Sequence, residues 1–340
     1  MLESTNPPLA ARLTRRGALG MAGAVLASTG ARGADFYDGK TLVIICGYNP
    51  GGGVDLGTRL IAEHIGAFIP GRPSVVVQNM EGAGGLIAAN FIYNRAPRDG
   101  LTLAAPGRDW ILKPLLGFKN ARFDPLKLEF IGSSGANNDI AMVHRDTGVY
   151  DGATLRAAKK PVLFGGLPGV TINMAVPKAF EMLGWPVRVI AGYDNTARIV
   201  QAMEQREVDA IYTAGVTFGR RHDLTDTGIV KPVFQAVPVL PGVATAESLV
   251  EEKDRPLIAL AHGQLSLGMP IVAPPEVAPE RLAILRLAFM AMARDPAYIA
   301  HAESIDEPTG APLSGEAIAA GAREIIAKIT PEAVAAYAKF

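Results

Sequence analysis

Cysteine is almost absent from this chain of 340 residues, which contains one, Cys46. A single cysteine can form no disulfide within the chain, and no group of cysteines and histidines has the spacing of metal ligands. We therefore predict no metal site and no cofactor. Because Cys46 falls within an apolar run, we expect it to be a small buried residue rather than a reactive thiol.

An excess of either charge is also lacking, since 33 basic residues balance 33 acidic ones. This balance argues against a nucleic-acid partner, which needs a basic surface. The apolar fraction of 49% and the charged fraction of 19% are typical of a globular protein with a sizeable core. The length is sufficient for two lobes.

The N-terminus has the pattern of an export signal. Arg15 and Arg16 precede an uncharged run at residues 17–31, which is too short to span a membrane. The arginine pair also indicates the twin-arginine route. We predict that residues 1–33 are a signal peptide cleaved near Gly33 and that the protein is periplasmic. Their removal takes away four basic residues and one acidic residue, which leaves 29 basic against 32 acidic residues.

A catalytic serine motif is missing as well. An α/β hydrolase needs serine in Gly-x-Ser-x-Gly, whereas Ser133 lies in Gly-Ser-Ser-Gly, with the wrong spacing. The five histidines are scattered and none lies in a glycine-rich turn. We therefore predict no catalytic residues and no enzyme, although an exported hydrolase stays a weaker alternative.

Glycine, in contrast, is concentrated in two turns. The first glycine turn, residues 48–55 (Tyr-Asn-Pro-Gly-Gly-Gly-Val-Asp), follows an apolar run at residues 41–46 that is typical of a buried strand. Apolar residues then recur at helical spacing to Ile65. Glycine lets a ligand approach the backbone, and the unpaired amides at a helix start favour an anion. The turn therefore predicts an anion site made of backbone.

The second glycine turn, residues 79–85 (Asn-Met-Glu-Gly-Ala-Gly-Gly), repeats this arrangement between a strand at residues 73–78 and a helix at residues 86–95. Neither turn ends in the Gly-Lys-Ser/Thr of a P-loop, and the first lacks the dinucleotide-binding order. We expect the two turns to face one cleft. Asp55 and Arg59 are spaced to pair within the first helix.

These motifs, together with residues 97–103, resemble the Bug family, the TctC-like extracytoplasmic receptors of tripartite tricarboxylate transporters. The resemblance resumes at residues 123–125, at Tyr193, at residues 207–210 and from residue 273 to residue 296. It implies a periplasmic-binding-protein-like α/β fold of type II, with two Rossmann-like lobes around a hinge. It also implies that both turns hold one ligand carboxylate, at Gly52, Gly53, Ala83, Gly84 and Gly85.

The chain departs from the family pattern beside these turns. Tyr48 stands where the family usually has phenylalanine, and Met80-Glu81 replaces Arg-Pro. Tyr48 is included among the predicted ligand residues, and Tyr193 because it matches a family tyrosine. The negative charge of Glu81 beside an anion site has no explanation from the sequence.

Three further polar residues are predicted to contact the ligand. Arg108 follows a strand at residues 101–105, at the carboxyl end where open α/β sheets bind ligands, although it could be a solvated surface residue. Asn137 lies where the chain should cross between lobes, and could instead form a turn. Thr171 precedes a helix and could face the ligand or cap the helix.

The predicted lobes follow from the two crossings. We assign residues 34–138 and 265–340 to lobe 1 and residues 139–264 to lobe 2. A strand is expected to run from residue 130 through to residue 143. The uncharged stretch at residues 257–275 is expected to be a buried strand that leads into a proline-rich turn.

The resulting expectation is a monomeric solute receptor that delivers a small organic carboxylate to the subunits of a membrane transporter. A periplasmic sensor subunit would share the fold and the pocket and stays an alternative. The sequence leaves the ligand open among dicarboxylates, tricarboxylates, aromatic acids and amino acids.

Overall fold

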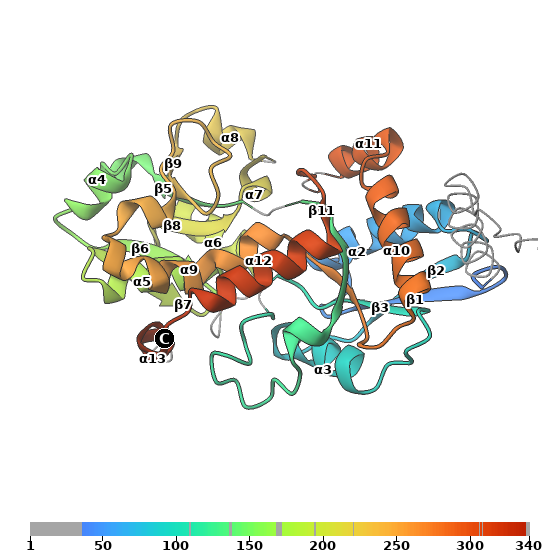
Figure 1. Ribbon diagram of the computed structural model, residues 1–340. Helices are drawn as coiled ribbons and strands as arrows, with labels where there is room; N and C mark the ends of the chain where they lie inside the picture. The colour runs from blue at the N-terminus through green and yellow to red at the C-terminus, as the bar shows by residue number, and fades with distance from the viewer. Residues whose placement is uncertain are drawn as a thin grey trace, which may run out of the picture.

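The computed structural model describes residues 36–337, apart from residues 109, 136–137, 168–171, 194, 220, 306 and 308. The predicted signal peptide, Asn137 and Thr171 lie outside these residues. Within the described part of the chain, no helix combines the length and apolar composition needed to cross a membrane. Two sheets, each with its own helices, form two lobes (Figure 1), which confirms the predicted α/β fold of two lobes.

The first sheet has the strand order β11-β4-β10-β3-β1-β2, in which β1 pairs in parallel with β2 and β3 while β10 runs antiparallel to β3 and β4. Its strands are β1 (Thr41–Cys46), β2 (Ser74–Asn79), β3 (Thr102–Ala105), β4 (Glu129–Ser133), β10 (Ile271–Ala273) and β11 (Leu313–Ser314). Its helices are α2 (Gly53–Ile65), α3 (Leu86–Asn94), α10 (Pro279–Met292), α11 (Pro296–Ser304) and α12 (Gly315–Ala327).

Helices cover both faces of this sheet because successive side chains of its strands point to opposite sides. Leu42 and Ile44 of β1 belong to one core with α2 and α10. Ile45, between them and the turn, belongs to a second core with α3. Cys46 is fully buried, as predicted, and burial raises the pKa of its thiol.

The second sheet has the order β7-β6-β8-β5-β9, in which β6 pairs in parallel with β7 and β8 while β5 runs antiparallel to β8 and β9. Its strands are β5 (Asp139–His144), β6 (Val162–Gly166), β7 (Val187–Ala191), β8 (Ala210–Ala214) and β9 (Val230–Gln235). The helices that follow or cover it are α4 (Gly152–Arg156), α5 (Ile172–Met182), α6 (Thr196–Glu204), α7 (Val216–Gly219), α8 (His222–Thr225) and α9 (Arg255–His262).

The chain crosses between the sheets twice, once between β4 and β5 and once between α9 and β10. The strand predicted over residues 130–143 is therefore wrong as a single element, because β4 and β5 belong to different sheets. The strand predicted in residues 257–275 is wrong over its first part, which forms α9. Residues 257–261 of that helix are all apolar, so the sequence there has no polar positions whose spacing would indicate a helix.

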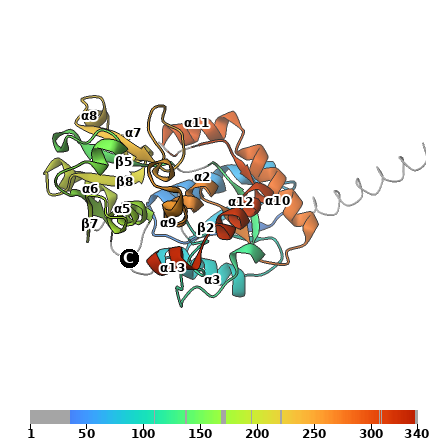
Figure 2. The same ribbon diagram turned by 60° about the vertical axis from the view of Figure 1, so that its left-hand side comes forward.

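Three helices tie the two lobes together. α12 contacts β4 of the first sheet, α13 (Pro331–Tyr337) packs on α9, and α9 packs on α5 of the second lobe. Figure 1 shows α12 extending from β11 of the first lobe toward α13, and Figure 2 shows the same helices in a turned view. One core cluster accordingly contains residues of both lobes, among them Trp110 of the first lobe and Phe234 of the second.

Candidate ligand-binding site

The first glycine turn joins β1 to α2, as the sequence predicts. Gly51 has a positive φ of 79°, and its amide donates to Oδ2 of Asp55 over 2.9 Å. The Gly52 amide donates to the Asn49 carbonyl over 3.4 Å, so Gly52 has a partner inside the turn. A Cβ added to Gly53 would meet nothing within 4 Å. Gly53 therefore begins α2 in open space, where an anion could reach the first amides of the helix.

The second glycine turn has an unusual backbone. Four successive residues have positive φ, from 127° at Gly82 through 49° at Ala83 and 59° at Gly84 to 81° at Gly85. This path favours glycine, and a Cβ at Gly85 would overlap the Pro106 carbonyl oxygen. The Gly85 amide donates to the Gly82 carbonyl over 3.1 Å, which leaves the earlier amides of the turn as the candidate donors.

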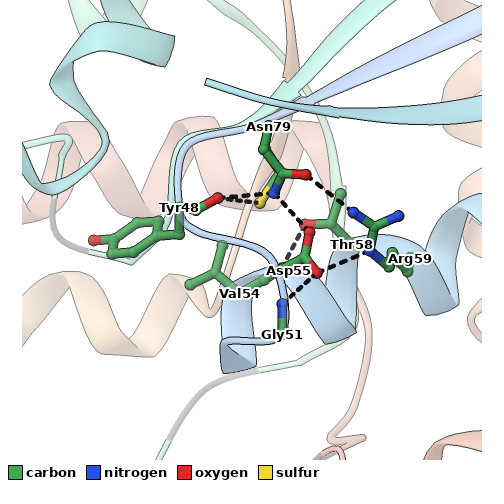
Figure 3. Close-up of polar contacts among 8 residues, drawn as sticks. Tyr48, Gly51, Val54, Asp55, Thr58, Arg59 and Asn79 are labelled. Carbon is green, nitrogen blue, oxygen red and sulfur yellow. Dashed lines mark hydrogen bonds and ion pairs between the residues drawn. The ribbon is translucent and has the colours of Figure 1, made fainter. Parts of the chain in front are cut away.

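A cluster of polar side chains links the two turns (Figure 3). Asn79, the last residue of β2, donates from Nδ2 to Oδ1 of Asp55 over 2.7 Å and to the Tyr48 carbonyl over 2.8 Å. Arg59 donates from Nε to Oδ2 of Asp55 over 2.8 Å and from a terminal nitrogen to Oδ1 of Asn79 over 3.0 Å. The predicted pair of Asp55 and Arg59 is confirmed, and Asn79 extends it to the second turn.

The charge of this cluster is neutralised internally. Asp55 is 1% exposed, and such burial by itself raises the pKa of a carboxyl. Hydrogen bonds from Arg59, Asn79 and the Gly51 amide outweigh that effect and lower the pKa of Asp55. The carboxylate therefore stays ionised without presenting a free negative charge beside the turns.

The ring of Tyr48 lies against the second glycine turn and against the loop after β3. It lies 3.5 Å from the position that a Cβ of Gly85 would take and 2.5 Å from that of Gly107. The three loops that follow β1, β2 and β3 therefore meet around Tyr48. The two turns lie side by side at the carboxyl ends of β1 and β2.

A buried lysine supports the second turn. Lys113 is 5% exposed, and its Nζ donates to the Gly84 carbonyl over 2.8 Å. It brings a positive charge to the turn, and sequence reasoning missed it because nothing in its local sequence indicates this contact. Glu81 is exposed, so water screens its charge from the turn.

Arg108 pairs with a buried carboxylate of the other lobe. It donates to Oδ1 of Asp139, the first residue of β5, over 2.9 Å. The Arg108 side chain is 22% exposed, whereas Asp139 is fully buried. Tyr212 lies in the same environment: burial, and next the charge of Asp139, raises the pKa of its hydroxyl, and Arg108 opposes this. Arg108 thus connects the lobes. The nearby Trp110 is buried in the core, where its ring packs against Phe123.

Tyr193 follows β7 in the second lobe, and its amide donates to the Gly166 carbonyl at the end of β6 over 3.3 Å. Its side chain is half-buried against the core around Ile211, and this burial raises the pKa of its hydroxyl. Asn138, beside the predicted Asn137, donates to Gln235 over 3.1 Å and so holds the crossing to β9.

No cluster of three potential metal-ligand side chains occurs among the residues described. No protein-family model matches the sequence. A curated protein of Cupriavidus necator, described as "UPF0065 protein in gbd 5'region", is 37% identical over 71 residues. That match spans 21% of this chain and 21% of the curated protein.

The solved structures decide the fold. A TctC solute-binding protein from Polaromonas aligns with a TM-score of 0.68 and 18% identity, over 89% of this chain and all of that chain. This chain has the TctC fold. The fold that the resemblance implied is thereby confirmed.

Two other structures with the TctC fold contain dicarboxylates. An R. palustris protein with adipate has a TM-score of 0.61 and 18% identity, over 88% of this chain and 97% of that one. MatC from Rhodopseudomonas palustris, with bound malate, has a TM-score of 0.57 and 18% identity, over 85% of this chain and 97% of that one.

Proposed function

We propose that this chain is an exported solute-binding receptor that holds a small organic carboxylate between its lobes and delivers it to a membrane transporter. One observation carries the proposal: two glycine turns, with the start of α2 in one and four positive φ angles in the other, lie side by side. Asn79 fixes their relative position through Asp55 and Tyr48. Two neighbours of the same fold contain malate and adipate, which supports a carboxylate as the ligand.

The predicted roles of the other residues are part of this proposal. The carboxylate would lie at Gly52, Gly53, Ala83, Gly84 and Gly85. The amides of Gly53, Ala83 and Gly84 would be its donors, because those of Gly52 and Gly85 donate within their own turns. Tyr48 would line its side, and Tyr193 with the loops that contain Asn137 and Thr171 would contact the rest of the ligand from the second lobe. We infer that the protein binds its ligand without transforming it, acts as a monomer, and loses residues 1–33 on export to the periplasm.

A thermal-shift and calorimetric screen tests the proposal. Malate, adipate, citrate and benzoate should include at least one ligand that raises the melting temperature, because a ligand that binds only the folded state stabilises it by about 2.7 kcal/mol at 100 times its Kd. The variant Gly53→Trp should abolish that shift, since the indole would occupy the space in front of α2.

The control is Leu287→Trp, which adds the same ring on α10 at a side chain that is 73% exposed. It should keep the wild-type shift, and both variants should keep the wild-type melting temperature without ligand to within a few degrees. An unchanged ligand affinity in Gly53→Trp would rule out the proposed carboxylate position.

A further inference from the structure

A groove of about 690 Å³ runs along the outer face of α3, separate from the predicted ligand residues. Its residues on the helix recur at spacings of three and four, which places them on one face. The lining residues are Met80, Ile87, Asn90, Phe91, Asn94, Arg95, Asn120 and Arg122. Its volume falls in the range of small-molecule sites, about 300–1,000 Å³.

The walls of the groove are fixed by side-chain amides. Asn90 donates to the Asn120 carbonyl over 2.7 Å and accepts from the Arg122 amide over 2.8 Å. Asn94 donates to the Arg122 carbonyl over 2.8 Å. These bonds hold the loop at residues 118–122 beside α3, so the groove is formed before anything binds in it.

The floor and the rim of the groove differ in chemistry. Met80, Ile87 and Phe91 provide an apolar floor, and Ile87 is 47% exposed although it is aliphatic. Arg95 and Arg122 contribute guanidinium groups that have no ion-pair partner among the described residues, and none of the lining residues is acidic. An apolar surface beside two uncompensated cations matches an amphiphilic anion.

We propose that this groove is a second ligand site, for a carboxylate attached to an apolar chain. The apolar chain lies on Ile87 and Phe91, and the carboxylate is bound by Arg95 and Arg122. The site adjoins the second glycine turn, since the Cδ1 atom of Ile87 lies 2.5 Å from the position that a Cβ of Gly82 would take. Met80 of that turn also lines the groove, so a ligand in the groove would lie beside the turn.

Titration of the purified protein with octanoate, octanamide and octylammonium tests this proposal by calorimetry. We expect one equivalent of octanoate to bind with a Kd below about 1 mM. Octanamide should bind at least tenfold more weakly and octylammonium should not bind. The double variant Arg95→Gln/Arg122→Gln should weaken octanoate binding at least tenfold, whereas Arg294→Gln, an exposed arginine at the end of α10, should not.

The variant Gly53→Trp separates this site from the carboxylate position proposed above. It should leave octanoate binding unchanged; loss of octanoate in Gly53→Trp would place the probe between the lobes and overturn the proposal. Equal binding of octanoate and octylammonium, or unchanged binding in the double arginine variant, would also overturn it. So would a dimer in sedimentation that the double variant abolishes, because a second copy of the chain would then fill the groove.

Discussion

Asn79 is the residue on which the geometry of the site depends. Its amide group donates to Asp55 and to the Tyr48 carbonyl and accepts from Arg59. A neutral side chain that both donates and accepts can join a carboxylate, a guanidinium and a carbonyl without adding charge. Aspartate at this position could not donate to the carbonyl and would repel Asp55.

We expect Asn79→Ala to destabilise the protein by about 2–3 kcal/mol, because it leaves an oxygen of the buried Asp55 carboxylate without its donor. Ligand affinity should fall as well, since the two turns lose their link. Urea denaturation measures the first effect. Asn49→Ala, at an exposed residue of the first glycine turn, is the control and should change stability by less than about 0.5 kcal/mol. Equal urea midpoints for the two variants would contradict this role of Asn79.

The two crossings form one packed element at the junction of the lobes. Gly268 has a φ of 68°, and a Cβ there would overlap both the Gly135 carbonyl oxygen and Oγ of Ser133. The Met269 amide donates to the same Oγ over 3.2 Å, and the Gly310 amide donates to the Ser134 carbonyl over 3.1 Å. Close approach of backbones at these glycines thus sets how the lobes are joined.

Gly268→Ala should therefore cost more than its backbone strain alone. The matched control is Gly242→Ala, which also has a positive φ, 77°, but whose Cβ would meet nothing within 4 Å. We expect about 1–2 kcal/mol for the control, the cost of a left-handed non-glycine residue, and a clearly larger loss for Gly268→Ala. Denaturant midpoints measure both. Equal losses would show that the crossing does not restrict this position sterically.

Across the whole molecule, the ion pair of Arg108 and Asp139 connects the two lobes. Removing one partner of a buried pair typically costs about 3–5 kcal/mol, because the remaining charge is left without compensation. Arg108→Gln should therefore be strongly destabilising, since Asp139 is fully buried.

A double-mutant cycle provides the test. Arg108→Gln/Asp139→Asn should be more stable than Arg108→Gln alone, because the second change removes the buried charge. Unfolding free energies from guanidinium titration measure all four proteins. Additive losses would mean that the two side chains do not interact, and the pair would then have no role in joining the lobes.

Much of the site could be predicted from the sequence because its chemistry is local. A strand, a glycine turn and a helix at residues 41–65 specify unpaired amides at the start of α2 through neighbours in the chain. The same holds for the second turn, and for the pair of Asp55 and Arg59, which is set by helical spacing.

The partners of Arg108, Lys113 and Asn79 could not be predicted, because each contact joins residues more than 20 positions apart or crosses between loops. The error at residues 257–275 has a related cause: an apolar run without polar residues has no periodicity that separates a helix from a strand. α9 is a helix because it packs on α5 and α13.

The sequence by itself determined the two glycine turns, the strands before them and the helices after them, because short-range sterics and hydrogen bonding of the backbone fix these elements. Only the tertiary structure decided that the turns adjoin, that Asp139 pairs with Arg108, and that a groove opens along α3. These features depend on which distant side chains the packing of the sheets brings together, and no local pattern encodes that.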